Sequence, residues 1–423
     1  MAGRMRFFAR TLCALAVVAG LAVPGAATRA KASAPQQLVV GYRSAADLAR
    51  LDVRVVRRIP ALHSAVVEAR GRVDGQAPVL RRALTVDAPA LAPTYQPGVA
   101  WEWEWDAADM NAVPDSVQRA AGRVKIAVID SGADVNAPDL ADKAPETWSV
   151  LSHSHRVRDV LGHGTFVSSL AAGSIDDGVG IAGFGGDAKL LVVQAIGKDG
   201  YITDVDEATA IVYAVKHGAK IINLSIGGAQ TSRIEQRAIR YAARHGVLVV
   251  AAAGNEHDQG NPVEYPAALL QRVGSRGRRG IGLAVGATTM NGTRASFSNT
   301  GTYLSLAAPG ENVFAAESAD SDWPHAQPSW PSPGYYGWAS GTSFAAPEVA
   351  GAAALVWGAN PSLTAVQVAQ VLKQSASGAG WTPELGWGRL DAAAAVRLAQ
   401  ATEGAELPRA RYAPRPIHSS PAA

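Results

Sequence analysis

The sequence predicts an α/β protein with a doubly wound, mainly parallel sheet. Two observations lead to this class. Short, uninterrupted apolar runs recur along the middle of the chain, as is typical of parallel strands that are buried on both faces. Longer segments with apolar residues at helical spacing separate these runs, and repeated strand–helix units imply right-handed crossovers. The composition agrees with this class, because 48% of the 423 residues are apolar.

Each element of the expected alternation can be assigned to a segment. The strands are expected at residues 125–129, 189–195, 220–225, 247–253 and 281–285. The helices are expected from His163 onward and at residues 205–217, 234–244, 344–358 and 364–375. The helix over 344–358 contains Pro347, which we expect in its first turn, where a missing N–H is tolerated.

Residues 1–32 have the pattern of a secretory signal peptide. Three arginines near the N-terminus precede an apolar run over 11–23, and small residues follow at 25–27. The run is too short to span a bilayer comfortably, and no later stretch is long and apolar enough to serve as an anchor. The single cysteine, Cys13, lies inside this segment, so the exported protein would contain no disulfide. We expect a secreted protein, extracellular or periplasmic, without a membrane anchor.

Residues 33–100 are expected to form a separate, small α+β unit. Strands are expected over 38–42 and on both sides of Pro60, followed by a short helix over 79–86 and a proline-rich stretch over 88–98. At the other end, residues 403–423 contain four prolines and are expected to be disordered. A formal net charge of +3 with no basic stripe argues against a nucleic-acid partner.

Three short motifs hold the chemically reactive residues, namely IAVIDSG around Asp130, GHGTFVSSLAAG around His163 and SGTSFAAP around Ser343. Each reactive residue is expected at the end of a strand or the start of a helix, where functional groups gather in α/β proteins. Taken singly, Asp130 could cap a turn, His163 could be a core histidine and Ser343 could cap a helix. Together they supply an acid, an imidazole and a hydroxyl in that chain order.

This combination suits nucleophilic attack on a carbonyl carbon. A serine hydroxyl is a weak nucleophile, so a neighbouring imidazole must take its proton during the attack. We expect His163 to be that general base and Asp130 to hold the imidazole in the correct tautomer. The negatively charged oxygen that forms in the tetrahedral intermediate then needs fixed hydrogen-bond donors.

The three motifs resemble those of the subtilisin-like (subtilase) serine peptidases, from about residue 124 to about residue 400. The order Asp, His, Ser is the one found in subtilisin. The resemblance implies a three-layer subtilisin-like fold with a catalytic domain over 101–402, and a serine endopeptidase that cleaves polypeptides through Asp130, His163 and Ser343. It also implies an oxyanion hole made of Asn255 and the backbone N–H of Ser343. The alternative for Asn255 is a loop residue that tolerates a left-handed turn. We expect a monomer.

The resemblance further implies two backbone segments that pair with an extended peptide substrate, Ser225-Ile226-Gly227 and Ala252-Ala253-Gly254. Glu264 corresponds to the base of the pocket for the residue before the cleaved bond, and Glu256 lies near its rim. Two carboxylates there would favour Arg or Lys in the substrate. The alternative is that Glu264 turns outward or pairs with an arginine such as Arg272, which leaves a broad apolar preference.

Two further expectations rest on the resemblance. Residues 33–100 would be a propeptide that assists folding and inhibits the enzyme; the alternative is an accessory binding domain. A loop after the helix at His163 resembles the structural calcium site of the family, and the alternative is an acidic surface turn. The expected calcium ligands are the carboxylates of Asp139 and Asp177 and the backbone carbonyls of Ile175, Val179 and Ile181.

Other classes fit less well. The Asp130-Ser131-Gly132 triplet also matches an aspartic peptidase, but that mechanism needs a second copy and the sequence has none. An α/β-hydrolase would have its histidine after the serine, and the only later histidine is His418 in the tail. A catalytically silent binding protein on the same fold is the alternative from another class. The aromatic segment over 320–338 could form a substrate-facing rim or a cluster that pins a long loop.

Overall fold

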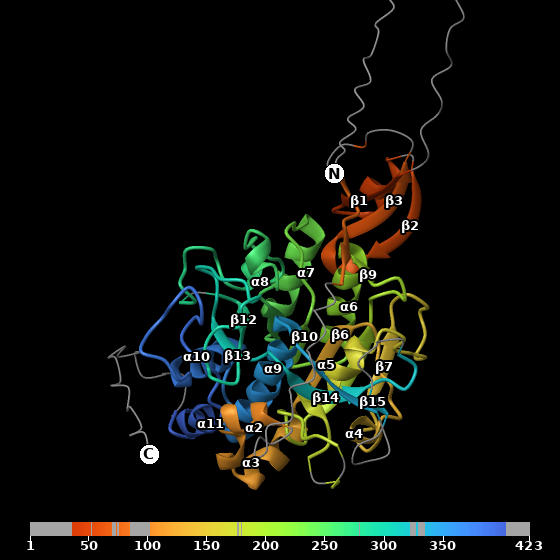
Figure 1. Cartoon of the computed structure of the whole chain (residues 1–423). Helices are drawn as coiled ribbons and strands as arrows, with labels where there is room; N and C mark the ends of the chain where they lie inside the picture. Colours follow the sequence, from red (N-terminus) through yellow and green to blue (C-terminus); the bar gives the residue numbers. More distant parts are fainter. Residues whose placement is uncertain are drawn as a thin grey trace, which may run out of the picture.

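The computed structural model describes residues 36–84 and 102–402, with gaps at 52, 70–72, 74–75, 176, 179, 279, 322–326 and 329–334. The expected signal peptide, the proline-rich stretch over 88–98 and the expected disordered tail lie outside the described residues. None of the helices in the described part is both long enough and apolar enough to cross a membrane. In Figure 1, a small N-terminal unit lies against one side of a larger α/β unit.

A seven-stranded sheet forms the centre of the larger unit, in the order β13-β12-β11-β10-β6-β8-β7. Every neighbouring pair in this sheet is parallel. The sheet grows in both directions from β6, its first strand in the chain, which is the doubly wound arrangement that the sequence predicts. The strands are β6 (Lys125–Asp130), β7 (Glu146–Ser149), β8 (Lys189–Gln194), β10 (Ile221–Leu224), β11 (Leu248–Ala252), β12 (Gly282–Thr288) and β13 (Leu306–Pro309).

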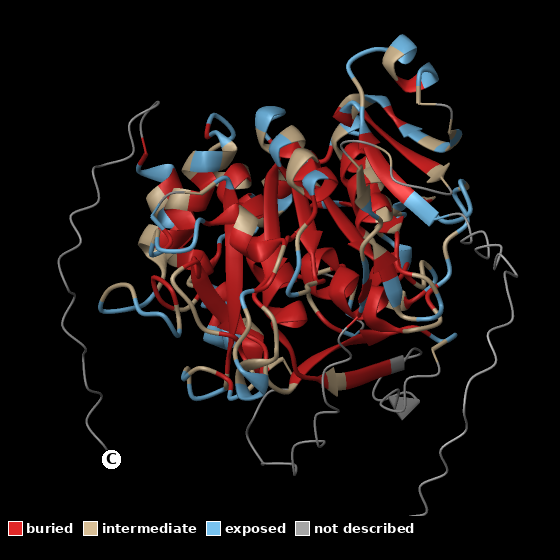
Figure 2. Cartoon of the chain, turned by 90° about the horizontal axis from the view of Figure 1, so that it is seen from above, coloured by how far each residue is buried: buried red, intermediate tan, exposed pale blue. Residues whose placement is uncertain are grey.

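Helices cover both faces of this sheet, so the larger unit has three layers (Figure 1). One face packs against α5 (His163–Ala172), α9 (Thr342–Ala359), α10 (Ala365–Ser375) and α11 (Ala392–Gln400), and the other against α6 (Asp204–Lys216), α7 (Arg233–Arg244) and α8 (Ala267–Leu270). Alternate residues of β6 belong to the two different cores, because successive side chains of a strand point to opposite faces. Figure 2 shows that the buried residues concentrate in these three layers.

The strands and helices predicted for the larger unit are all present, with ends shifted by a few residues. The predicted place of Pro347 is wrong. Helix α9 begins at Thr342, so Pro347 is the sixth residue and lies in the second turn, where its missing N–H removes an intrahelical hydrogen bond.

A small antiparallel sheet follows the central one in the chain, in the order β14-β16-β15. The aromatic segment that the sequence singled out contributes both β15 and β16 to this sheet. The rings of Tyr336 and Trp338 lie 5.8 and 4.8 Å from the ring of Phe314. These two side chains therefore pin the segment to the core; Trp323 and Trp330 lie outside the described residues. The remaining elements are α2 (Trp103–Ala107), α3 (Asp115–Ala120), α4 (Pro138–Ala141), β9 (Tyr201–Thr203), β14 (Val313–Glu317), β15 (Gln327–Pro328) and β16 (Tyr335–Ala339).

The N-terminal unit is a four-stranded antiparallel sheet, in the order β2-β3-β1-β4, with one short helix. A separate small apolar core holds it together. The three longer strands are where the sequence predicts them. The elements are β1 (Gln36–Gly41), α1 (Ala45–Ala49), β2 (Arg54–Ile59), β3 (Ser64–Ala69) and β4 (Gln76–Pro78).

The helix predicted over 79–86 is wrong, because its central part is strand β5 (Arg81–Ala83). This strand pairs antiparallel with β9 of the larger unit. Its middle residue, Arg82, is buried while its two neighbours are exposed, which is the period of a strand. The short segment carries too few apolar residues to distinguish a helix from a strand, and the edge of β9 decides its conformation.

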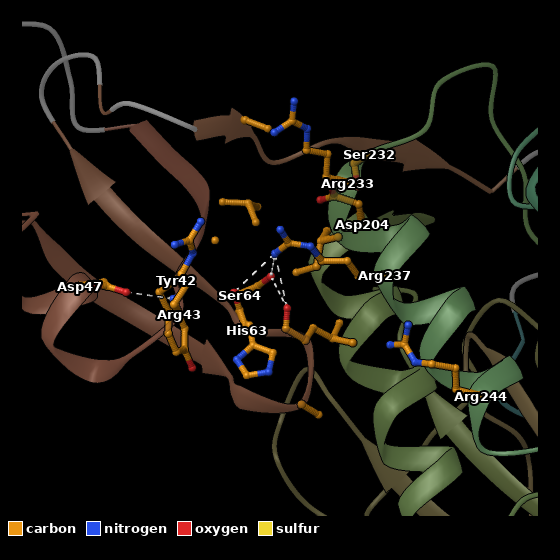
Figure 3. Close-up of a pocket in the computed structure, with 16 residues that line it drawn as sticks. Tyr42, Arg43, Asp47, His63, Ser64, Asp204, Ser232, Arg233, Arg237 and Arg244 are labelled. Atoms are coloured by element: carbon orange, nitrogen blue, oxygen red, sulfur yellow. Dashed lines mark hydrogen bonds between the residues drawn. The ribbon is translucent and has the colours of Figure 1, made fainter.

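A second contact joins the two units, and Figure 3 shows it. Arg237 of α7 reaches across to the start of β3, where it donates a hydrogen bond of 2.8 Å to the hydroxyl of Ser64. Arg237 and Ser64 line an open pocket of about 920 Å³ between the two units. Nearby, Arg57 of β2 forms an ion pair of 2.5 Å with Asp206 of α6. The N-terminal unit is thus held against α6 and α7 by polar contacts and by apolar packing. Val39, Ile59, Leu62 and Val66 belong to the same buried cluster as apolar residues of these two helices.

Candidate active site

Asp130 and His163 meet at the carboxyl end of the parallel sheet. Asp130 is the last residue of β6, and His163 is the first residue of α5. His163 Nδ1 lies 2.8 Å from Asp130 Oδ1, and both side chains are almost completely buried. With Nδ1–H donating to the carboxylate, Nε2 is the basic nitrogen of the ring.

Two glycines allow the strand end and the helix start to touch. Gly132 follows β6 with a φ of +118°, which favours glycine. A Cβ atom on Gly164 would lie only 2.1 Å from the carbonyl oxygen of Gly132. A side chain at position 164 would therefore push α5 away from β6 and separate His163 from Asp130.

Asp159 is a buried carboxylate that ties the same two segments together, and the sequence analysis missed it. Its Oδ1 accepts hydrogen bonds from the Ser131 hydroxyl at 2.8 Å and the Gly162 N–H at 3.0 Å. Its Oδ2 accepts from the N–H of Thr165 at 2.8 Å and from the hydroxyl of the same residue. Burial raises the pKa of Asp159, and these hydrogen bonds oppose that shift. An aspartate shortly before Gly162, at the start of a helix, was the available sequence signal.

Ser343 lies in the first turn of α9, where backbone N–H groups have no partner within the helix. Pro347, four residues later, has no N–H to donate to the Ser343 carbonyl. The hydroxyl of Ser225 donates to that carbonyl instead, at 2.6 Å, and the Ser343 hydroxyl donates to the Ser225 carbonyl at 3.4 Å. The proline thus frees a carbonyl that joins the reactive serine to the end of β10.

The start of α9 also lies beside α5. The rings of His163 and Phe344, the residue after Ser343, are 5.7 Å apart. The packing of these two helices therefore brings the second and third motifs to one place.

Asn255 is oriented by Thr342, the residue before Ser343. Its Oδ1 accepts from the backbone N–H and from the hydroxyl of Thr342, both at 2.9 Å. The Thr342 hydroxyl in turn accepts from the N–H of Gly254 at 3.1 Å. These bonds fix the orientation of the side-chain amide, because its oxygen faces Thr342. The NH2 group of Asn255 is then available to donate to a substrate oxygen.

One small pocket holds Ser343 together with most of the predicted substrate-binding residues. Ala253 is the exception. It is fully buried, its N–H donates to the Val285 carbonyl at 2.9 Å, and its carbonyl accepts from the Tyr303 hydroxyl at 3.2 Å. The structure therefore places Ala253 behind this pocket. The predicted residues that do line it are Ser225, Ile226, Gly227, Ala252, Gly254, Asn255 and Glu264, and the others are Leu84, Glu256 and Thr342.

Glu264 is directed into the pocket rather than outward, since it is only 4% exposed. A Cβ atom on Gly227 would lie 2.9 Å from Glu264 Oε2, so the glycine makes room for the carboxyl group. Burial, followed by the charge of Glu256, raises the pKa of Glu264 to about 7. Glu256 is itself held, because its Oε2 accepts from the N–H of Asn255 at 2.8 Å.

The N-terminal unit reaches this pocket, which the sequence did not predict. After β5, the N–H of Leu84 donates to the carbonyl of Gly200 at 2.5 Å, and Leu84 lines the pocket beside Ser343. The segment thus lies in the extended conformation that a bound peptide would have.

Two of the predicted calcium ligands, Asp139 and Asp177, lie close enough for their charges to interact. Asp139 Oδ1 accepts from the Ile181 N–H, and its Oδ2 accepts from the Tyr336 hydroxyl, both at 2.7 Å. Burial raises the pKa of Asp139 to about 6. Ile181 thus presents a donor to this carboxyl group, and Val179 lies outside the described residues. The calcium site that the resemblance implies stays a prediction, and no step below depends on it.

Comparisons with known proteins agree with this geometry. The model of the subtilase family matches residues 122–388. Subtilisin BL from Lederbergia lenta is 36% identical over 274 residues, which cover 65% of this chain and 91% of that protein. A thermophilic serine proteinase from Bacillus sp. (strain AK1) is 33% identical over 260 residues, 62% of this chain and 58% of that protein. The chain therefore spans less than two thirds of the second relative.

A solved structure shows the same fold. Fervidolysin from Fervidobacterium pennivorans, described as a keratinolytic enzyme related to subtilisin, superimposes with a TM-score of 0.71 at 24% identity. The match covers 89% of this chain and 62% of that chain.

The fold, the site and the family match together define the class: the chain belongs to the subtilase family. It is accordingly a serine endopeptidase, a hydrolase that acts on peptide bonds.

Proposed function

We propose that this chain is a secreted endopeptidase in which Ser343 is the nucleophile, His163 the general base and Asp130 the residue that orients the imidazole. The observation that carries the proposal is the hydrogen bond of 2.8 Å between His163 and Asp130. It lies beside the first turn of α9, which contains Ser343. A rotation about the Cα–Cβ bond of Ser343 would move its hydroxyl from the Ser225 carbonyl toward the imidazole.

The reaction proceeds in two steps. His163 Nε2 takes the proton of the Ser343 hydroxyl as Oγ attacks the carbonyl carbon of the substrate, and then gives that proton to the leaving amine. The peptide C–N bond breaks and an ester to Ser343 Oγ remains. Water then attacks the ester and loses a proton to His163. The ester C–O bond breaks, His163 returns the proton to Ser343 Oγ, and the carboxylic acid product leaves. Asp130 stabilises the imidazolium in both steps.

Negative charge that develops on the carbonyl oxygen is stabilised by two donors. These are the side-chain NH2 of Asn255 and the N–H of Ser343 at the N-terminus of α9. Thr342 supports this role of Asn255, because it holds the amide oxygen and thereby sets the direction of the NH2 group.

The N-terminal unit acts as an intramolecular inhibitor in this proposal. Strand β5 pairs with β9, and Leu84 lines the same pocket as Ser343. A substrate in that place would meet an occupied site. The chain would become active after cleavage beyond residue 84, with residues 33–100 serving as the propeptide and residues 101–402 as the catalytic domain. The arginine-rich start and the apolar run over 11–23 support export through a signal peptide.

Labelling with a serine-directed fluorophosphonate probe tests the function. The proposal expects one label per active chain, on Ser343, together with cleavage of unfolded casein. A folded chain that neither reacts with the probe nor cleaves peptides would instead be a catalytically silent binding protein on the subtilase fold.

Asn255→Ala is expected to lower kcat by about 10²- to 10³-fold with little change in KM, because the lost donor acts on charge that exists only in the transition state. Steady-state kinetics on a peptide substrate measure this. Asn136→Ala, which removes an exposed amide, is the control and should keep the wild-type kcat. A melting temperature close to that of the wild type would show that the folded state survives the loss of the contact with Thr342. An unchanged kcat would contradict the role of Asn255.

The preference for Arg over Phe before the cleaved bond is expected to rise with pH. Glu264, whose pKa burial raises to about 7, is neutral below that pH and charged above it. The ratio of kcat/KM for the two peptides should rise by up to about tenfold from about pH 6 to about pH 8.5, as the charged fraction does. In Glu264→Gln the ratio should stay flat. A preference for Phe at every pH in the wild type would rule out the basic specificity.

A further inference from the structure

Arg82 lies in a buried acidic pocket of the catalytic domain, apart from the pocket that holds Ser343. Its Nη1 donates to Glu207 Oε2 at 2.9 Å, and its Nη2 lies 2.8 Å from Glu235 Oε2. Its Nη2 also donates to the carbonyl of Gln230 at 2.8 Å. The arginine side chain is 7% exposed, and those of both glutamates are fully buried. Glu207 belongs to α6 and Glu235 to α7, so the pocket lies between two helices of the catalytic domain.

The pocket has room for this side chain because position 228 carries no Cβ. A Cβ atom on Gly228 would lie 2.8 Å from Cδ and 3.1 Å from Cγ of Arg82. Gly228 follows Gly227, which lines the pocket beside Ser343. One stretch of backbone thus borders both pockets.

The backbone of Arg82 runs as a peptide substrate would. Arg82 pairs with Ile202 in the antiparallel ladder of β5 and β9, and Leu84, two residues later, lies beside Ser343. Side chains of a strand alternate, so Arg82 and Leu84 lie on the same side of the segment. Arg82 therefore lies a fixed number of residues before the bond that Ser343 would attack.

Two buried carboxyl groups side by side favour a cation between them. Burial, followed by the charge of Glu235, raises the pKa of Glu207 to about 8, and the charge of Arg82 opposes this shift. Among the described residues, no donor reaches Glu207 Oε1 or Glu235 Oε1. Departure of Arg82 would leave two uncompensated acids in the protein interior, which is strongly unfavourable.

We propose that Glu207 and Glu235 form an arginine-binding subsite for peptide substrates, which Arg82 occupies in the full-length chain. The inference rests on the proposed function. The preferred substrates carry an arginine at the third or fourth position before the cleaved bond, depending on whether cleavage follows the residue in the place of Leu84 or the next one. Arginine should be preferred over lysine, because its two terminal nitrogens reach one carboxylate each, whereas lysine has a single nitrogen.

A positional scan tests the subsite. Internally quenched peptides carry one residue, either Arg, Lys or citrulline, at each of the second to fifth positions before the bond. Citrulline has nearly the shape of arginine without its charge. The enzyme is the processed wild type, with its N-terminus read by mass spectrometry. If the chain stays at full length, Arg82→Gln is used, so that its own arginine does not compete. We expect kcat/KM to be about tenfold or more higher for Arg than for citrulline, at one position only, and mainly through KM.

Glu207→Gln is the test variant, since Glu235 also accepts a hydrogen bond from Ser232 at the start of α7. It should abolish most of the difference between Arg and citrulline, mainly by lowering kcat/KM for the Arg peptide. Asp206→Asn is the matched control, because it removes the same charge from the neighbouring position of α6, which pairs with Arg57 instead. If Glu207→Gln folds poorly, Arg82→Gln/Glu207→Gln removes both partners and preserves the test.

The outcomes are distinct. Equal kcat/KM for Arg and citrulline at all positions, or an arginine preference that Glu207→Gln leaves intact, would overturn the subsite while leaving the peptidase function in place. Equal kcat/KM for Arg and citrulline would mean that the pocket binds only Arg82 of the chain itself and no arginine of a substrate. Absence of both cleavage and fluorophosphonate labelling would overturn the proposed function, and the subsite with it.

Discussion

Ser343→Ala is expected to lower kcat by about a million-fold, the size known for the triad serine of subtilisin. Without Oγ no ester can form, and the remaining catalysis comes from the oxyanion donors and substrate binding alone. The residual kcat is measured from the cleavage of a peptide substrate over hours to days. Titration with a fluorophosphonate shows that no wild-type enzyme contaminates the sample. The variant should also remain at full length, with residues 36–84 still docked against α6 and α7, while the wild type becomes shorter.

Ser340→Ala is the control for this experiment. Its hydroxyl lies three residues earlier and accepts a hydrogen bond from the N–H of Asn312 at 2.9 Å, so its loss should leave kcat near the wild-type value. Wild-type activity in Ser343→Ala would refute the role of Ser343. A wild-type chain that is fully active while retaining residues 33–100 would refute the inhibitory role of the N-terminal unit and leave the triad untouched.

Asp130→Asn is expected to lower kcat by about 10⁴-fold with KM nearly unchanged. The amide NH2 can donate to His163 Nδ1, which stabilises the tautomer with its proton on Nε2. That tautomer cannot accept the proton of Ser343. The amide also provides no negative charge for the imidazolium that forms during attack. Steady-state kinetics, with fluorophosphonate labelling as a second readout of serine reactivity, measure both effects.

Asp134→Asn removes a carboxylate four residues further along, where its side chain accepts from the N–H groups of Asn136 and Ala319. It should keep the wild-type kcat, which separates the role of Asp130 from a general loss of negative charge near the site. A fall in kcat of the same size in both variants would assign the effect to the surrounding structure instead.

The central sheet and the reactive residues could be predicted from local patterns. The strand that ends at Asp130 is a continuous apolar run, and helix α9 is rich in alanine. In both segments, hydrophobic burial and intrinsic secondary-structure propensity favour the same structure. The glycines around His163 predicted a close approach of two backbone segments, and the structure shows that approach between Gly164 and Gly132. Where the local pattern was short, as over 79–86, the prediction of a helix was wrong because pairing with β9 outweighs local preference.

Contacts between distant segments could not be read from the chain in the same way. Asp159 accepts three hydrogen bonds from the nearby Gly162 and Thr165, but the fourth comes from the hydroxyl of Ser131, 28 positions earlier, and no local pattern specifies that partner. Asp139 gives a second example, because its Oδ2 accepts a hydrogen bond from the hydroxyl of Tyr336, 197 positions later in the chain.

The order of the motifs and the residue types alone established an acid, an imidazole and a serine on an α/β scaffold, because strand ends, helix starts and chemical identity are local properties. The pairing of Arg82 with Glu207 and Glu235 depends on the tertiary structure instead. Glu207 lies 125 positions and Glu235 lies 153 positions after Arg82, and each is an ordinary charged residue in its own segment. Only when β5 pairs with β9, and Gly228 leaves space beside it, does burial bring the three charges together and give them a common role.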